Sequence, residues 1–164
     1  VLGEGPGRPE GGGGAVAVSS AKLEPGLAAQ HLAAVRGVAE LCQAEVHGDA
    51  LGSQELSFRP GTVREGRAAI PVGTAGSVTL VLQACLMALV SSRARVELQG
   101  SGGTDVPLAP PASYCEHVLL PLLALIGYPV RWELVRSGFY PEGGGLVHVS
   151  TEGADVLPSD ALGG

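Results

Sequence analysis

The feature that most constrains this chain is a regular order of short apolar segments in its second half. Segments of strand composition alternate with longer apolar runs of helical length, and turn residues separate them. The order strand, helix, strand, helix, strand, strand is predicted for residues 67–72, 76–90, 93–99, 113–127, 129–135 and 146–150. The fourth of these segments is expected to be kinked or to begin at Pro121, because proline disturbs a helix interior.

A shorter version of this order precedes residue 62. The pattern predicts a strand at 15–19 (AVAVS), a helix within 27–46, a strand at 54–58 that points Leu56 and Phe58 one way, and a turn region at 59–66. The helix carries one apolar face, formed by Leu32, Val35, Val38, Cys42 and Val46.

These two patterns predict an α/β fold of the α+β type, built from repeated βαβαββ units. Two helices are expected on one face of a small mixed sheet, with the other face open to water. The predicted organisation is a Gly-rich tail at 1–14, a partial first repeat at 15–61, a second repeat at 62–150 and a tail at 151–164.

Three consecutive glycines in the stretch GFYPEGGG, residues 138–145, need a physical reason, because glycine loses more backbone freedom on folding than any other residue. A phosphate-binding P-loop would continue into a helix and carry a Lys, and this stretch does neither. The glycines therefore predict a turn or bulge that lets the chain enter an edge strand.

Charge restricts the partners of this protein. The net charge is −6, and only one of the ten basic residues is a lysine, Lys22. Proteins that bind nucleic acid through bulk electrostatics have the opposite balance, so any contact with RNA or DNA must rely on a few placed arginines.

The three cysteines, Cys42, Cys85 and Cys115, lie in apolar surroundings without CxxC spacing. They are predicted to be buried, reduced thiols of a cytoplasmic protein, with nuclear placement left open, rather than zinc ligands or disulfides. No run is long enough to cross a membrane. The start at Val1, without Met or a signal segment, indicates processing or a fragment.

Five segments together resemble one family, the RNA 3'-terminal phosphate cyclases. We refer to them as the motif blocks, and they occur in family order and spacing: PGLAAQHLAAVRGVAELC (25–42), LGSQELSFRPG (51–61), GTAGSVTLVLQ (73–83), GGTDVPLAPPASY (102–114) and GFYPEGGG (138–145). The family fold consists of βαβαββ repeats similar to those of the enolpyruvate transferases, whose own substrate signatures are not visible in this chain.

The resemblance implies a reaction and a set of site residues. Members of this family use ATP, with a divalent metal such as Mg, to convert an RNA 3'-phosphate into a 2',3'-cyclic phosphate through an adenylylated histidine. Gln83 and Pro110 match positions that bind the nucleotide, and we expect Gln83 in a cleft beside the loop 102–111. Gln30 and Lys22 match positions near the RNA phosphate, and His31 adjoins them. As alternatives, Gln83 is a buried helix amide, Pro110 a plain loop proline and Gln30 a residue that serves the first helical turn.

The chain also departs from the family pattern. Ser19 and Lys22 stand where the family has arginines. Ser19 therefore lacks a guanidinium that could bind a phosphate through two hydrogen bonds, and Lys22 retains only a point charge. Glu4 is a candidate remnant of a metal-associated acid. None of the four histidines, His31, His47, His117 and His148, lies in the family's nucleophile motif, so no catalytic residue and no metal ligand is assigned.

Three hypotheses for function follow from these observations. The first is a truncated or divergent cyclase that cannot complete the reaction alone, because the part with the nucleophilic histidine is missing or belongs to a second polypeptide. The second is a non-catalytic, cyclase-like scaffold that binds RNA or protein. The third is a degenerate remnant with an exposed edge where a further repeat would pack.

Overall fold

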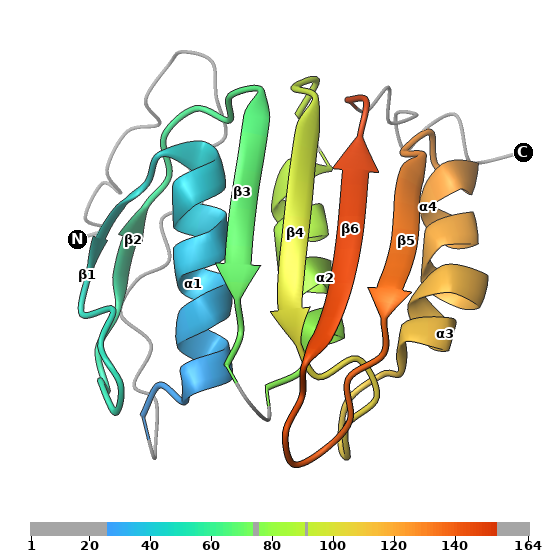
Figure 1. Cartoon of the computed structure of the whole chain (residues 1–164). Helices are drawn as coiled ribbons and strands as arrows, with labels where there is room; N and C mark the ends of the chain where they lie inside the picture. Colours follow the sequence, from blue (N-terminus) through green and yellow to red (C-terminus); the bar gives the residue numbers. More distant parts are fainter. Residues whose placement is uncertain (1–25, 74–75, 91, 154–164) are drawn as a thin grey trace, which may run out of the picture.

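The structure is a computed structural model that describes residues 26–73, 76–90 and 92–153. A four-stranded mixed sheet carries helices on one face, and a separate two-stranded ribbon lies beside it (Figure 1). This is the α+β class that the sequence predicted. Several predictions concern residues outside the described ranges, namely the strand at 15–19, the tail at 1–14, and Glu4, Ser19 and Lys22.

The element order confirms the alternation predicted after residue 66. The first part contains α1 (Ala29–Cys42), β1 (Glu45–His47) and β2 (Ser57–Arg59). The second part contains β3 (Gly66–Pro71), α2 (Val78–Leu89), β4 (Val96–Gly102), a helical segment in three pieces, β5 (Val130–Arg136) and β6 (Gly145–Thr151). The three pieces are α3 (Ala112–Tyr114), the π-helical turn η1 (Cys115–Leu119) and α4 (Leu120–Leu125).

The four-stranded sheet has the order β3-β4-β6-β5. Strands β3 and β4 are parallel, as expected when a helix connects them, whereas β6 pairs antiparallel with both of its neighbours. The strand after the triple glycine, β6, is therefore central. The expectation that the glycines lead into an edge strand is wrong: the edges of this sheet are β3 and β5.

The helical face of the sheet holds the core. Alternate strand residues such as Ala68, Leu98 and Val149 lie in one register row and are buried beneath the helices. Helix α2 is apolar nearly all round, which is typical of a helix buried on several sides. Helix α1 packs on the same face, since a Cβ added at Gly37 would lie 3.2 Å from both Cys85 Sγ and Ile70 Cδ1.

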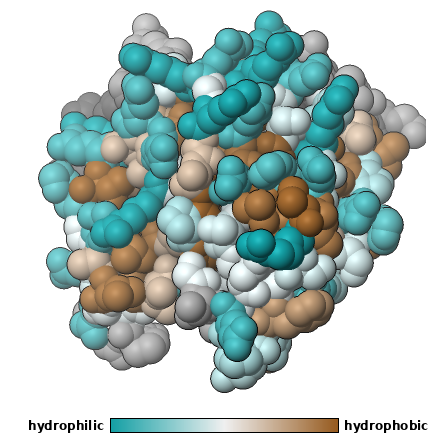
Figure 2. Space-filling view, in the orientation of Figure 1, coloured by the Kyte–Doolittle hydropathy of each residue, from teal (hydrophilic) through white to brown (hydrophobic). Residues whose placement is uncertain are grey.

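The opposite face of the sheet is open to solvent, as the alternating polar residues predicted. Arg67, Glu97 and Gln99 are exposed, while the residues between them are buried. Figure 2 shows hydrophilic residues spread over this face, with smaller hydrophobic patches among them. We call it the open sheet face.

Three predictions about element boundaries are wrong. The strand predicted at 54–58 begins only at Ser57, as β2, so Leu56 lies before it. Helix α1 ends at Cys42 because Gln43 adopts a left-handed conformation with φ of 51°, which turns the chain into β1. Val46 therefore lies in strand β1 rather than on the apolar face of the helix. Strand β4 starts at Val96, three residues later than predicted, and continues through the two glycines 100 and 102.

The segment predicted as one helix at 113–127 is helical but irregular. It widens into the π-helical turn η1 immediately before Pro121, and the N–H of Leu120 bonds to the carbonyl of Cys115. A proline cannot donate a hydrogen bond, and its ring clashes with the carbonyl four residues earlier. The wider turn therefore directly precedes the first turn of α4, which contains Pro121, so the helix is irregular at the place where the sequence predicted a kink or a helix start.

The three cysteines are buried and unpaired, as predicted. Burial raises the pKa of the Cys85 thiol to about 12 and that of the fully buried Tyr128 hydroxyl to about 12. Both groups are therefore held in their neutral form. Among the helices of the described residues, none has the length and apolar character that a membrane span requires.

Candidate functional site

The motif blocks meet at one end of the four-stranded sheet, which we call the motif end. It lies at the bottom of Figure 1, where β3, β4 and β5 finish, β6 begins, and α1 and α2 have their N-termini. The first two blocks are joined there, because Leu27 N–H donates to Ser53 O and Gly52 N–H donates to Leu27 O. Ends of parallel strands and N-termini of helices are common places for ligand sites.

A chain of hydrogen bonds connects three of the motif blocks. Gln30 Oε1, on α1, accepts from the backbone N–H of Ser77 at 2.7 Å. The Ser77 hydroxyl lies 2.7 Å from that of Thr79, which donates to the carbonyl of Pro110 at 2.6 Å. Ser77 and Thr79 are fully buried, so these bonds satisfy groups that water cannot reach.

The N-terminus of α2 has its own internal partners. Besides the bond from Ser77 to Gln30, Val78 N–H donates to Gly103 O at 2.8 Å and Leu80 N–H to Ser77 Oγ at 3.2 Å. Free N–H groups at a helix start form an anion site. Because these three donors are occupied, the start of α2 positions the surrounding loops, and a phosphate there would have to compete with Gln30.

Gln83 lies one turn beyond Thr79 on α2. Its side chain is half-buried, and Nε2 is 3.6 Å from Cys115 Sγ, at the start of η1. Burial raises the pKa of the Cys115 thiol, and the contact with Gln83 partly opposes that effect. Gln83 is therefore not sealed in the apolar core. Its hydrogen-bond partner, Cys115, follows the loop 102–111 in the sequence and is not part of that loop. The role of Gln83 in nucleotide binding stays a prediction.

Pro110 acts through its backbone in this structure. It is half-buried, and its carbonyl anchors the loop 102–111 to Thr79 on α2. The same loop also carries Leu108, which has a positive φ of 63° and is fully exposed. The proposed role of Pro110 in nucleotide binding stays a prediction beside this observed anchoring role.

The loop after β4 is also fastened to the loop after β5. Thr104 and Asp105 both donate their backbone N–H to Gly138 O, and Gly138 N–H donates to Thr104 Oγ1 at 2.9 Å. The Thr104 hydroxyl in turn donates to Asp105 Oδ2 at 2.8 Å. Two motif blocks are thus joined by reciprocal bonds between Thr104 and Gly138, which are 34 positions apart in the sequence.

The glycines of GFYPEGGG have two separate physical reasons. Gly143 and Gly144 have φ of 72° and 74°, and Gly143 N–H closes a turn onto Phe139 O at 2.7 Å. Gly145 instead lies against other backbone: a Cβ there would be 2.8 Å from Gly102 O. The prediction of a turn is confirmed, and no helix follows that could make it a P-loop.

A cation is held at the motif end by this turn. Arg136, the last residue of β5, is exposed, and its Nε donates to Gly144 O at 2.6 Å. His31 is also exposed and lies beside Gln30, but its Nδ1 accepts the N–H of Ala28 at 3.4 Å. The lone pair of that nitrogen therefore serves the start of α1.

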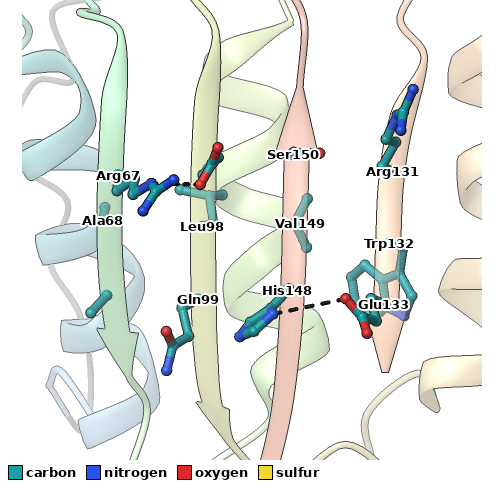
Figure 3. A pocket seen from close by; sticks show the side chains of 12 residues that line it. Arg67, Ala68, Leu98, Gln99, Arg131, Trp132, Glu133, His148, Val149 and Ser150 are labelled. Atoms are coloured by element: carbon teal, nitrogen blue, oxygen red, sulfur yellow. Dashed lines mark ion pairs between the residues drawn. The ribbon is translucent and has the colours of Figure 1, made fainter. Parts of the chain in front are cut away.

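The open sheet face forms a second candidate region, a shallow hollow of about 710 Å³ (Figure 3). Arg67 Nε pairs with Glu97 Oε2 at 2.6 Å, and His148 Nδ1 lies 3.9 Å from Glu133 Oε2. Both pairs link neighbouring strands and are largely exposed. Charges of both signs alternate here, so the face does not favour a polyanion.

Metal binding has no support among the described residues. In the ranges 26–73, 76–90 and 92–153, no group of three or more His, Cys, Asp or Glu side chains is placed to hold an ion. These ranges therefore offer no ready site for the divalent metal that the resemblance implies.

The residues that the sequence analysis missed are the ones that fasten the motif blocks together, Ser77, Thr79, Thr104 and Arg136. One signal was available, because a serine immediately before an apolar helix is a typical N-cap, and Ser77 Oγ fills that role for α2. The bonds of Thr104 and Thr79 to distant loops leave no local pattern in the sequence.

One comparison with known proteins agrees with this arrangement. A family model described as RNA 3'-terminal phosphate cyclase matches residues 11–160, which is most of the chain and includes all five motif blocks.

Proposed function

This chain belongs to the RNA 3'-terminal phosphate cyclase family, and from that premise we propose that its motif end binds the 3'-phosphate end of an RNA for ATP-dependent cyclisation. The observation that carries the proposal is the joining of the motif blocks at one end of the sheet through Gln30, Ser77, Thr79 and Thr104.

Two side chains are proposed to contact the RNA phosphate. The amide oxygen of Gln30 is occupied by Ser77, which fixes the side chain and directs its NH₂ donors away from that bond. Arg136 adds an exposed guanidinium whose Nε is held by Gly144, so its terminal nitrogens remain outside that contact. Lys22 is proposed as a third, weaker contact.

The nucleotide is proposed to lie near Gln83 and Pro110. When bound, ATP supplies an AMP group, which on the RNA 3'-phosphate acts as a good leaving group that the neighbouring 2'-hydroxyl can displace. The half-buried Gln83 amide is suited to orienting a polar ring edge, because it is partly shielded from water by Cys115 and α2.

We further propose that these 164 residues alone do not become adenylylated. His31 is the histidine adjacent to the proposed phosphate contacts, and its Nδ1 is occupied by Ala28 N–H. His148 lies in the middle of the open sheet face, and His47 and His117 are exposed residues of β1 and η1. None of the four therefore combines a free ring nitrogen with an enclosed place at the motif end.

A non-catalytic RNA- or protein-binding scaffold is the second candidate, and one observation favours it. The N–H groups of Ser77, Val78 and Leu80 at the start of α2 bond to Gln30, Gly103 and the Ser77 hydroxyl, respectively, rather than being left for a ligand. In this case the motif end would be a structural connection between loops, and RNA with or without a 3'-phosphate would bind equally.

Two measurements test the proposal. Fluorescence anisotropy with one oligoribonucleotide, ending in a 3'-phosphate or a 3'-hydroxyl, should show tighter binding of the phosphate form. Equal affinity would favour the scaffold.

Intact mass spectrometry after incubation with ATP and Mg should show no addition of AMP to the protein. An AMP adduct would overturn the proposal that these residues alone are not adenylylated.

A further inference from the structure

The two edges of the four-stranded sheet are protected to different degrees. At the β3 edge, α1 packs on the strand more extensively than α4 packs on β5, and β3 ends in Pro71, which cannot donate a hydrogen bond to an added strand. Strand β5 contains neither proline nor lysine, and it exposes Leu134 and Val135 at 36% and 46%. Unpaired edges of this kind readily pair with another strand.

Helix α4 continues this apolar surface. It lies beside β5 in Figure 1, and it exposes Leu122 and Leu125 at 55% and 73%. Val118 and Tyr114 on the preceding turns are also exposed, at the spacing of one helical face. Among the residues that the structure describes, the side of the molecule formed by β5 and α4 thus combines a strand edge that has no paired neighbour with an apolar helix face.

The charges on β5 indicate which strand fits this edge. Arg131 and Glu133 are exposed residues, two positions apart on the open sheet face. In an antiparallel pairing of β5 with a second β5 centred on Trp132, each Arg131 stands directly opposite a Glu133 of the other copy. Such directly opposed pairs of opposite charge stabilise a sheet.

The two symmetric registers shifted by one residue to either side are unfavourable. Centring on Arg131 would oppose two arginines, and centring on Glu133 would oppose two glutamates. The regular part of β5 supports the same centre. A bulge interrupts the pairing with β6 between Leu134 and Arg136, so residues 130–134 are regular, and Trp132 is their midpoint.

We propose that β5 is a homodimer interface, in which two copies of this chain pair antiparallel around Trp132 and form a continuous eight-stranded sheet. Val130 then lies opposite Leu134 of the other copy on the helical face, and the exposed apolar residues of α4 are brought toward the two-fold axis. This inference is independent of the proposed RNA chemistry, because it uses none of the motif-end contacts.

Charge reversal tests both the interface and its register. Wild-type protein should be a dimer by light scattering or sedimentation at micromolar concentration. Arg131→Glu places two glutamates opposite two glutamates, and Glu133→Arg places arginines opposite arginines, so each variant should dimerise at least ~10-fold more weakly. A mixture of the two variants should form heterodimers, since every opposed pair is then of opposite charge. The double variant R131E/E133R should recover the homodimer.

Each of these outcomes decides the proposal. Because both side chains are exposed, the single variants should keep the wild-type circular dichroism spectrum and a cooperative melt, which separates loss of the interface from loss of the fold. Their melting temperature should fall only by the amount that the lost association contributes. A wild-type protein that stays monomeric up to about 100 μM would overturn the proposal. So would single variants that dimerise as well as wild type, or a mixture that fails to form heterodimers.

Discussion

The motif end and the open sheet face are both polar regions of one sheet, but they are held together differently. At the motif end, the buried hydroxyl of Thr79 and the half-buried amide of Gln30 connect segments that are distant in the sequence. On the open sheet face, exposed ion pairs such as Arg67–Glu97 connect strands that are already paired. The difference indicates where the fold fixes geometry for function, because only buried, cross-connected groups are costly to change.

The largest expected effect comes from the glycines that bring motif-end backbones together. A Cβ at Gly138 would lie 2.5 Å from Gly102 O and 2.6 Å from Gly143 O, so G138A should lower the free energy of unfolding by about 3 kcal/mol or more. The matched control is G144A, which has open space and only an unfavourable φ, and should lose about 1 kcal/mol. Urea denaturation measures both, and equal losses would show that close approach does not limit this turn.

The free energy of unfolding should decrease at alkaline pH, because the core beneath both regions contains a buried thiol. The pKa of the Cys85 thiol is raised from 9.0 to about 12 by burial, so its stabilising contribution is complete below pH 9.0 and is lost as the pH rises toward 12. The unfolded chain ionises first, at a cost to stability of about 1.4 kcal/mol for each pH unit. Urea midpoints at pH 8.5 and 10.5 measure the decline, which C85A should reduce. A midpoint independent of pH would contradict the buried state of this thiol.

Replacing Ser77 or Ser150 by alanine removes the same hydroxyl group from the motif end or from the open sheet face. Ser77 is buried, caps α2 and contacts Thr79, so S77A should cost about 1 to 2 kcal/mol. Ser150 lies on the open sheet face, and S150A should change stability by less than about 0.5 kcal/mol. Thermal melts followed by circular dichroism measure the pair. If the two losses were equal, the hydroxyl network would have no special weight.

The smallest effect is expected for the ion pair Arg67–Glu97. Its side chains are 82% and 50% exposed, so solvent and salt screen the attraction despite the short distance. R67A should therefore change the free energy of unfolding by less than about 1 kcal/mol, and the difference from wild type should vanish at 1 M NaCl. A salt-independent loss of 2 kcal/mol or more would show that the open sheet face is also tightly coupled.

Much of the fold could be predicted because its signals are local. Alternation in β4 and β6 and the apolar run of α2 identified the elements, and the motif blocks alone indicated the family that the family model then matched. What could not be predicted depends on contacts between distant residues. The left-handed Gln43 that ends α1 early and the central place of β6 are set by tertiary packing, not by nearby sequence.

The candidate site shows the same division. Gln30 and Gln83 were found because they stand in motif blocks, and the structure places both at or near the motif end. The bond of Gln30 to Ser77 and that of Pro110 to Thr79 were not predictable, since 47 and 31 residues separate the partners. Lys22 lies outside the described residues, so its part in the site stays a prediction.

The most direct test of the motif end as an RNA phosphate site is a pair of identical charge changes. Q30E keeps an oxygen that can accept from Ser77 N–H but replaces the NH₂ donors by negative charge, whereas Q99E makes the same change on the open sheet face. Anisotropy with a 3'-phosphorylated oligoribonucleotide should show affinity at least ~10-fold weaker for Q30E and within about twofold of wild type for Q99E. Equal weakening by both variants, or by neither, would contradict the account.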